Sequence, residues 1–189
     1  VSSIVLKEDE PSMFVFPFPR LNKRGLPTLF SIPRNIKSKN VLNSKIKGNK
    51  YPFAHFFNGA LISIDSVRKI GLVNKDFFIY GDEVDYFFRL RKIGQVFSVT
   101  NAYHFHPDVS NRVFTPVKIY YVLKNTIILH KRYFDHVLIR NIMLIFVVLF
   151  RATKRNGIKF IFSLLFGQNK NCFYPAIIRG FKEKIGKDF

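Results

Sequence analysis

The chain has 189 residues, enough for one domain or for one domain with an appendage. Its 31 basic residues outnumber 12 acidic ones, and the net charge of +19 predicts an anionic partner: a nucleic acid, nucleotide phosphates or an anionic membrane face. The single cysteine, Cys172, excludes an internal disulfide and a cysteine-rich zinc site, and it favours a reducing, cytoplasmic setting.

The first fifty residues contain two expected strands and a basic segment. Residues 1–5 have strand composition, and so does the apolar run 13–18, which prolines bound. Residues 20–50 combine Lys, Asn and scattered prolines without any periodicity. We expect this segment to be an irregular, mobile basic loop at the surface.

Regular structure is expected again after residue 51. Residues 60–64 are predicted to form a short buried strand, and Asp65 is predicted to cap a short helix at 66–70 that Gly71 ends. Residues 95–100 have good strand composition. His104 and His106 follow at the i, i+2 spacing that places two side chains on one side of a strand.

The centre of the chain is the stretch 76–91. Its apolar run 77–80 is predicted to be a buried extended segment that leads into Gly81. Three carboxylates follow within four residues, those of Asp82, Glu83 and Asp85, although the whole chain has only 12 acidic residues. A helix is expected from there to Arg91, with Asp82 as its N-cap residue.

Two interpretations of the three carboxylates stay open. Acidic residues at a helix start interact favourably with the helix dipole, so all three could serve the helix alone. One acid suffices for a cap, however. Clustered carboxylates at a helix start after a glycine are also how an α/β protein presents a general base or a cation site.

Beyond residue 112 the sequence is helical and basic. Residues 117–133 have the pattern of an amphipathic helix, and residues 174–189 that of a basic amphipathic helix. The apolar runs 142–150 and 158–166 are too short to span a bilayer, which takes about 20 residues. We expect them to cap the core, to lie in a membrane interface, or to do both.

The run from Asn58 to Pro107 resembles the second half of the catalytic domain of family 2 glycosyltransferases, in the branch of rhamnosyl- and galactofuranosyltransferase-like enzymes. The similarity is carried by segments in a fixed order: Phe-Asn-Gly-Ala-Leu-Ile-Ser at 57–63, Val-Arg-Lys-Ile-Gly-Leu at 67–72, Asp-Phe-Phe-Ile-Tyr-Gly-Asp-Glu-Val-Asp at 76–85, Arg-Leu-Arg-Lys-Ile-Gly at 89–94, and a histidine before Pro107. The similarity continues more loosely through 118–125 and 176–181, so it covers roughly residues 51 to 189.

The resemblance implies the fold class α/β, as the C-terminal part of a GT-A (Rossmann-like) glycosyltransferase domain with an α-helical C-terminal extension. Residues 1–112, including the basic loop 20–50, are then the acceptor side of the catalytic domain, and residues 113–189 are a helical, basic region. The family places an Asp-x-Asp motif and its nucleotide-binding strands upstream of this region, and no Asp-x-Asp occurs before residue 50. We infer that the chain is the C-terminal portion of a glycosyltransferase, and we expect it to be inactive alone.

The resemblance also implies an activity: metal-dependent, inverting transfer of a sugar from a nucleotide-diphosphate sugar to a glycan or lipid-linked acceptor. UDP- or dTDP-sugars are the expected donors. The usual base position of the family matches Glu83, with Asp82 as the second candidate. Acceptor-side or structural support is expected from four residues: Asp85, Asn58, Gly59 and Arg89.

In many relatives a histidine after the next strand completes a site for Mn²⁺ or Mg²⁺. The match before Pro107 favours His106 as that ligand, with His104 as the second choice. Imidazole suits Mn²⁺, whereas Mg²⁺ more often takes oxygen ligands.

The basic tail predicts peripheral contact with an anionic membrane, at the inner face of the plasma membrane on the cytoplasmic side. The alternative is a basic module without catalysis that binds nucleic acid or a membrane surface. The acidic cluster argues against a nucleic-acid partner, because it would repel phosphates unless a metal bridges them.

Overall fold

The computed structural model describes residues 1–56, 59–110 and 112–189. The chain forms two compact units: unit 1 comprises Val1–Leu72 and Phe87–Ser110, and unit 2 comprises Val73–Tyr86 and Asn111–Phe189. The chain passes from unit 2 to unit 1 within one helix, α3 (Asp82–Arg91). The mixed α/β class is confirmed. The GT-A fold and the domain boundary between residues 112 and 113 stay predictions.

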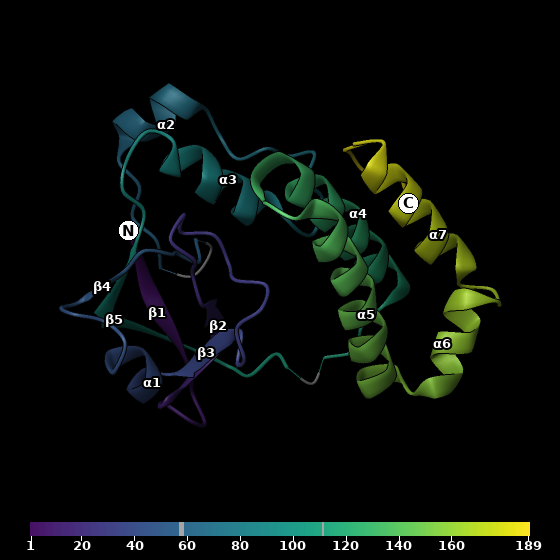
Figure 1. The fold of residues 1–189 in the computed structure, drawn as a ribbon, viewed down its shortest axis with the longest axis horizontal. Coiled ribbons are helices and arrows are strands. Elements are labelled where there is room, and N and C mark those ends of the chain that lie inside the picture. The colour runs from purple at the N-terminus through teal and green to yellow at the C-terminus, as the bar shows by residue number, and fades with distance from the viewer. Residues whose placement is uncertain (57–58, 111) are drawn as a thin grey trace. The chain divides into compact units, whose positions relative to one another are not determined.

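Unit 1 contains a five-stranded sheet (Figure 1). Its strands are β1 (Ser2–Lys7), β2 (Met13–Pro19), β3 (Asn35–Ser38), β4 (Lys50–Tyr51) and β5 (Ser98–His106). The order across the sheet is β3-β2-β1-β5-β4. The central pair β1 and β5 is parallel, and the other three neighbouring pairs are antiparallel.

The core of unit 1 follows from side-chain alternation along the strands. Ile4 and Leu6 of β1 lie two residues apart and are both fully buried, as a period of two on one face of a sheet requires. Phe14 and Phe18 of β2 pack against them, with their two rings edge to face at 5.2 Å. The strands expected at residues 1–5 and 13–18 are thus confirmed.

The expectation that residues 20–50 are irregular is wrong for residues 35–43. Ile36 of β3 is buried beside Phe18. The helix α1 (Lys39–Asn43) follows at once, with the Ser38 hydroxyl accepting from the Val41 amide at 3.5 Å and Leu42 buried in the core. Pairing with β2 and the burial of Ile36 and Leu42 hold this segment against the core of unit 1.

The buried strand expected at residues 60–64 is also wrong. Leu61 is exposed, and the helix α2 (Ile64–Ile70) begins at the end of that run. Ser63, and not Asp65, stands at the N-cap position, whereas Gly71 ends the helix as expected. The strand predicted at 95–100 is confirmed only in part: β5 begins later, at Ser98, and runs on through both histidines to His106.

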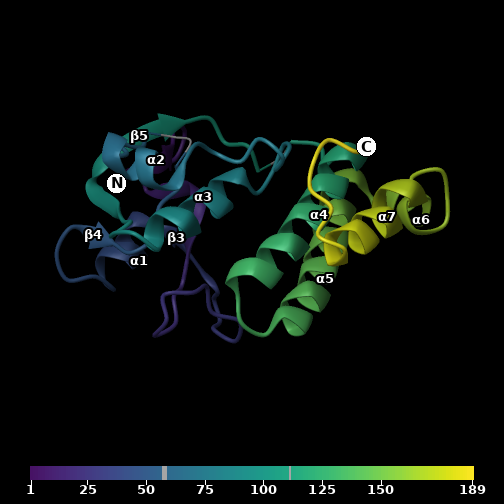
Figure 2. The same cartoon turned by 90° about the horizontal axis from the view of Figure 1, so that it is seen from above.

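Unit 2 is a group of helices around a buried central one (Figure 2). They are α4 (Pro116–Tyr133), α5 (Val137–Asn156), α6 (Ile158–Leu165) and α7 (Lys170–Phe181). The helix α4 packs against both α5 and α7. It is buried on nearly all sides, which explains why its apolar residues are not confined to one stripe.

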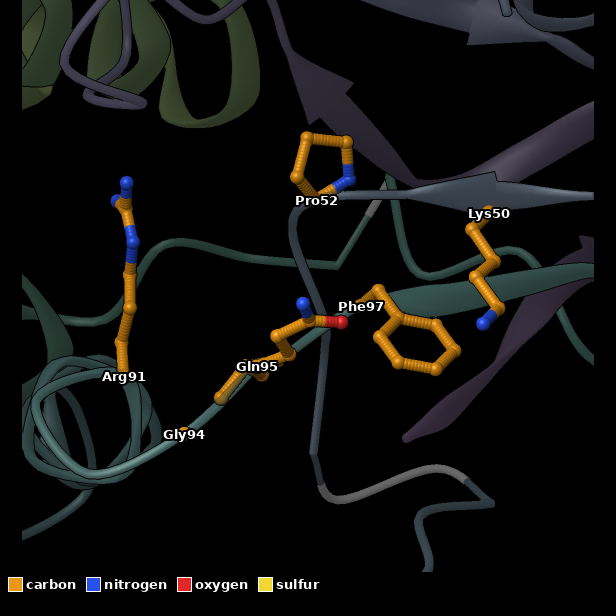
Figure 3. Close-up of a pocket in the computed structure, with 7 residues that line it drawn as sticks. Lys50, Pro52, Arg91, Gly94, Gln95 and Phe97 are labelled. Atoms are coloured by element: carbon orange, nitrogen blue, oxygen red, sulfur yellow. The ribbon is translucent and has the colours of Figure 1, made fainter. Parts of the chain in front are cut away.

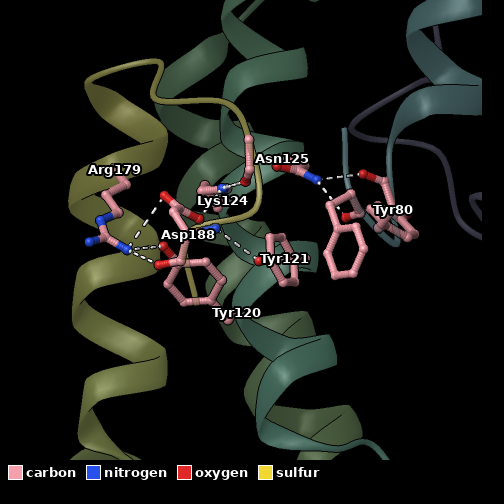
Figure 4. A network of polar contacts seen from close by, with 9 residues as sticks. Tyr80, Tyr120, Tyr121, Lys124, Asn125, Arg179 and Asp188 are labelled. Atoms are coloured by element: carbon pink, nitrogen blue, oxygen red, sulfur yellow. Dashed lines mark hydrogen bonds and ion pairs between the residues drawn. The ribbon is translucent and has the colours of Figure 1, made fainter. Parts of the chain in front are cut away.

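The Lys124 side chain on α4 is fully buried and organises the C-terminal residues (Figure 4). Its ammonium group donates to the Gly186 carbonyl at 2.8 Å and to Asp188 Oδ1 at 2.5 Å. Asp188 is held in addition by Arg179, which donates to its carbonyl at 2.6 Å, and by Tyr121, whose hydroxyl accepts from its amide at 3.2 Å.

The prediction of a helix over residues 174–189 is therefore wrong at both ends. The observed helix, α7, begins earlier, at Lys170, and ends at Phe181. Glu183 takes a left-handed φ of +52°, and the residues after it return to α4. A buried ammonium group must be paired, and the residues after the helix supply the partners of Lys124.

Among the described residues, no helix combines the length and the apolar character needed to cross a membrane.

Candidate functional site

The residues before α3 form a turn and not the buried extended segment that the sequence predicts. Phe77 is buried, but Ile79 is 51% and Tyr80 is 39% exposed. Ile79 has a φ of +65° and Gly81 a φ of +99°, both in the left-handed region, so the chain reverses direction here. An isoleucine rarely adopts this conformation, which implies that surrounding contacts impose it.

Asn125 of α4 supplies those contacts (Figure 4). Its amide nitrogen donates to the Tyr80 carbonyl at 2.6 Å and to the Phe78 carbonyl at 3.2 Å, and the Asn125 side chain is fully buried. A Cβ atom on Gly81 would lie 3.3 Å from the Asn125 Cβ and 3.1 Å from a methyl carbon of Leu129. Glycine is thus needed here for its φ and for the close approach of α4.

The C-terminal residues hold the same turn from another side. The Gly186 amide donates to the Asp76 carbonyl at 2.9 Å. The Lys187 ammonium group lies 5.2 Å from the centre of the Phe78 ring, within the range of a cation–π contact. Two segments that are distant in sequence, α4 and the residues after α7, therefore fix the point at which α3 begins.

The helix α3 begins at Asp82, so that residue lies in the first turn and is not the N-cap residue that the sequence predicts. The Gly81 carbonyl accepts the first helical hydrogen bond, from the Asp85 amide at 2.9 Å. All three acidic residues lie in the first turn, where the helix dipole favours negative charge.

Asp85 differs from the other two acids because it is buried. Its Oδ1 atom accepts a 2.6 Å hydrogen bond from the Tyr133 hydroxyl and lies 4.0 Å from an Arg132 nitrogen. Both partners come from the last turn of α4. These contacts attach α3 to the end of α4 and give Asp85 a structural role.

Asp82 and Glu83 are only partly buried. Burial raises the pKa of Asp82 above its usual value, and the neighbouring Glu83 charge adds to that rise, while hydrogen bonds from backbone amides oppose it. The start of α3 therefore presents two adjacent carboxylates, one of which has an increased proton affinity.

The predicted supporting residues Arg89 and Gly59 both lie in unit 1. The Arg89 guanidinium group donates to the carbonyls of Ile70 and Leu72, each at 2.7 Å, and so holds the end of α2. Gly59 has a φ of +74°, its carbonyl accepts from the Ser3 amide at 2.9 Å, and a Cβ atom there would collide with the Ser3 side chain. Asn58 lies outside the described residues.

The two predicted metal-binding histidines are on β5 in unit 1, with ring centres 6.4 Å apart. The His106 Nδ1 atom lies 2.7 Å from the Pro107 carbonyl oxygen. Because a carbonyl can only accept, Nδ1 must carry the hydrogen, and in the neutral ring the Nε2 lone pair is then available. Metal-binding histidines commonly have this arrangement, so His106 fits the role of one ligand.

Within residues 1–56, 59–110 and 112–189, no three or more His, Cys, Asp and Glu side chains are grouped as a metal site. His106 could supply one ligand, and the remaining ligands would have to come from elsewhere. The Mn²⁺ or Mg²⁺ site stays a prediction.

Unit 1 also contains a pocket of about 390 Å³ (Figure 3). Its lining consists of Lys50, Pro52, Arg91, Gly94, Gln95, Val96 and Phe97. The Lys50 ammonium group lies over the Phe97 ring at 4.6 Å, and the Arg91 guanidinium group donates to the carbonyls of Arg24 and Gly25. The lining has no carboxylate.

Comparisons of the chain with protein-family models, with curated proteins and with solved structures find no match.

The sequence analysis had not singled out Asn125, Tyr133 or Arg132 as parts of this site. The adjacent polar pair Lys124-Asn125 between the apolar residues 119–123 and 127–129 was the signal that could have indicated a buried polar contact.

We predict that Asn125→Ala lowers the free energy of unfolding by about 1–3 kcal/mol, because it leaves the partly buried Phe78 and Tyr80 carbonyls without their donor. Urea unfolding of both chains measures the difference. Asn171→Ala on the exposed side of α7 is the control and should have a smaller effect. Equal losses in the two variants would contradict the role given to Asn125.

We predict that a carboxyl-detected NMR titration finds the pKa of Asp82 above the usual aspartate range. Glu83→Gln should lower the pKa of Asp82, because it removes the neighbouring negative charge. The folded state binds the Asp82 proton more tightly than the unfolded state does. The free energy of unfolding therefore falls as the pH rises from the Asp82 pKa of the unfolded state through that of the folded state. Asp82→Asn should therefore gain stability relative to the parent chain at neutral pH and lose that gain in acid. An Asp82 pKa at or below the usual value would contradict the prediction.

Proposed function

We propose that the chain carries the acceptor side of a family 2 glycosyltransferase. The reaction is the inverting transfer of a sugar from a nucleotide-diphosphate sugar to a hydroxyl of a glycan or lipid-linked saccharide. The sequence motifs that follow one another in a fixed order from residue 57 to residue 107 support the family. The mixed α/β architecture is compatible with it.

The observation that carries the proposal is that the three acids at the start of α3 differ in their contacts and exposure. Asp85 is committed to Tyr133, and Asp82 and Glu83 remain partly exposed beside a tightly held turn. A helix start of this kind needs no more than one acid for its own stability. The raised pKa of Asp82 is typical of a carboxyl group adapted to proton transfer.

The proposed chemical step is a single displacement. One carboxylate accepts the proton of the acceptor hydroxyl while its oxygen attacks the anomeric carbon. The bond from that carbon to the diphosphate oxygen breaks, and the electron pair leaves with the nucleotide diphosphate. The family pattern assigns the base to Glu83. The raised pKa favours Asp82, because a base of higher pKa takes the proton more readily.

A divalent metal, Mn²⁺ or Mg²⁺, would neutralise charge on the diphosphate when it is bound. In this chain His106 would contribute one ligand through Nε2, held in orientation by its Nδ1 contact to the Pro107 carbonyl.

We predict that loss of the base reduces kcat by about 10²–10⁴-fold with little change in donor binding. The assay uses the protein expressed from the longest native open reading frame that contains this chain, because the chain alone is expected to be inactive, with a panel of nucleotide sugars and Mn²⁺ or Mg²⁺. Glu83→Gln and Asp82→Asn are compared with Asp65→Asn, an exposed acid on α2.

The outcomes separate the candidates. A large loss only in Glu83→Gln places the base there, and a large loss only in Asp82→Asn places it one residue earlier. Full turnover in both variants would overturn the carboxylate assignment. An absence of donor binding and of donor hydrolysis in the parent protein would overturn the glycosyltransferase proposal itself.

We predict that Mn²⁺ added to the chain broadens the NMR signals of the His106 ring before those of the exposed His136, which lies at the start of α5. His106→Ala should weaken Mn²⁺ binding by about ten-fold or more, and His104→Ala should weaken it less. Equal broadening at His106 and His136 would contradict the ligand assignment.

A further inference from the structure

The outward side of α5 is a continuous row of exposed apolar side chains. Leu138, Ile142, Phe146 and Phe150 follow one another at four-residue spacing and are 67%, 46%, 66% and 70% exposed. On the opposite side of the same helix, Val148 and Ala152 are fully buried in the core of unit 2. A helix that needed only to cover the core would carry polar residues in this outer row.

The row ends in cations. Lys154 lies one turn beyond Phe150 on the same face, and Arg151 lies one turn beyond Val147. Lys159 follows in the first turn of α6, and all three are exposed. The chain between residues 137 and 181 contains seven Lys and Arg residues and no Asp or Glu.

Not all of these cations are available. Arg140 pairs with Asp135 at 2.6 Å, and Arg179 is held by Tyr120 and Asp188. The cations at the end of the α5 row therefore provide the positive charge of this face, and no carboxylate of α5, α6 or α7 balances them. An exposed apolar row that ends in unbalanced cations matches an anionic surface with an apolar interior beneath it.

We propose that this row, with Arg151, Lys154 and Lys159, binds the surface of an anionic lipid bilayer. The row spans roughly 18 Å from Leu138 to Phe150, so the helix lies in the plane of the interface with its aromatic side chains among the acyl chains. The three cations contact the lipid headgroups. The proposal does not depend on glycosyl transfer.

The test is co-sedimentation of the full chain with vesicles of phosphatidylcholine, either alone or mixed with phosphatidylglycerol. We expect binding to the mixed vesicles that is weaker at higher salt and much weaker on phosphatidylcholine alone. Lys154→Gln and Lys159→Gln should each reduce the partition coefficient about five-fold. Phe146→Ser with Phe150→Ser should reduce it about ten-fold or more.

Phe30→Ser is the matched control, because Phe30 is 76% exposed in unit 1, outside the row. It should leave vesicle binding unchanged, and circular dichroism should show the same folded spectrum for all variants. No binding to mixed vesicles, or binding that the row substitutions do not change, would overturn the proposal. Self-association in ultracentrifugation that Phe146→Ser abolishes, without vesicle binding, would assign the row to a second copy of the chain instead.

Discussion

The arrangement of unit 2 depends on two adjacent buried polar side chains, Lys124 and Asn125 of α4. Lys124 binds the C-terminal residues through Gly186 and Asp188, and Asn125 binds the turn before α3 through Phe78 and Tyr80. A buried ammonium or amide group is costly unless it is paired, so these contacts offset the cost of burying the Lys124 ammonium group and the Asn125 amide nitrogen. One helix thereby fixes the positions of two segments that have no regular structure of their own.

This constraint decides what the acidic cluster can do. The turn held by Asn125 brings Gly81 so close to α4 that a Cβ atom there would crowd Leu129 and Asn125, and α3 starts immediately afterwards. Asp85 then lies inward on Tyr133, while Asp82 and Glu83 lie at the accessible end of the helix. Partial burial and the negative charge of Glu83 raise the pKa of Asp82. The position of α3 thus separates one structural carboxylate from two that are available for proton transfer.

The sequence predicted the elements whose periodicity is determined locally. The strands β1 and β2 follow from their strand-forming, apolar composition, and α4 follows from its helical pattern. The turn at residues 77–80 could not be predicted, because Asn125 determines its shape from 45 and 47 residues away. The end of α7 was missed for the same reason, since the attraction of Lys124 for Asp188 overrides a local helical pattern. The acids were found from their spacing, but their separate roles depend on tertiary contacts with Tyr133 and with the turn.

The central claim is that α4 positions the acidic start of α3 and thereby sets its proton affinity. The most direct measurement is the pKa of Asp82 by carboxyl-detected NMR in Asn125→Ala, compared with Asn171→Ala and the parent chain, in preparations whose amide spectra show a folded chain. The account predicts that the pKa of Asp82 falls toward its usual value in Asn125→Ala and stays raised in Asn171→Ala. An unchanged, raised pKa in Asn125→Ala would show that the start of α3 is positioned without this contact, and would contradict the account.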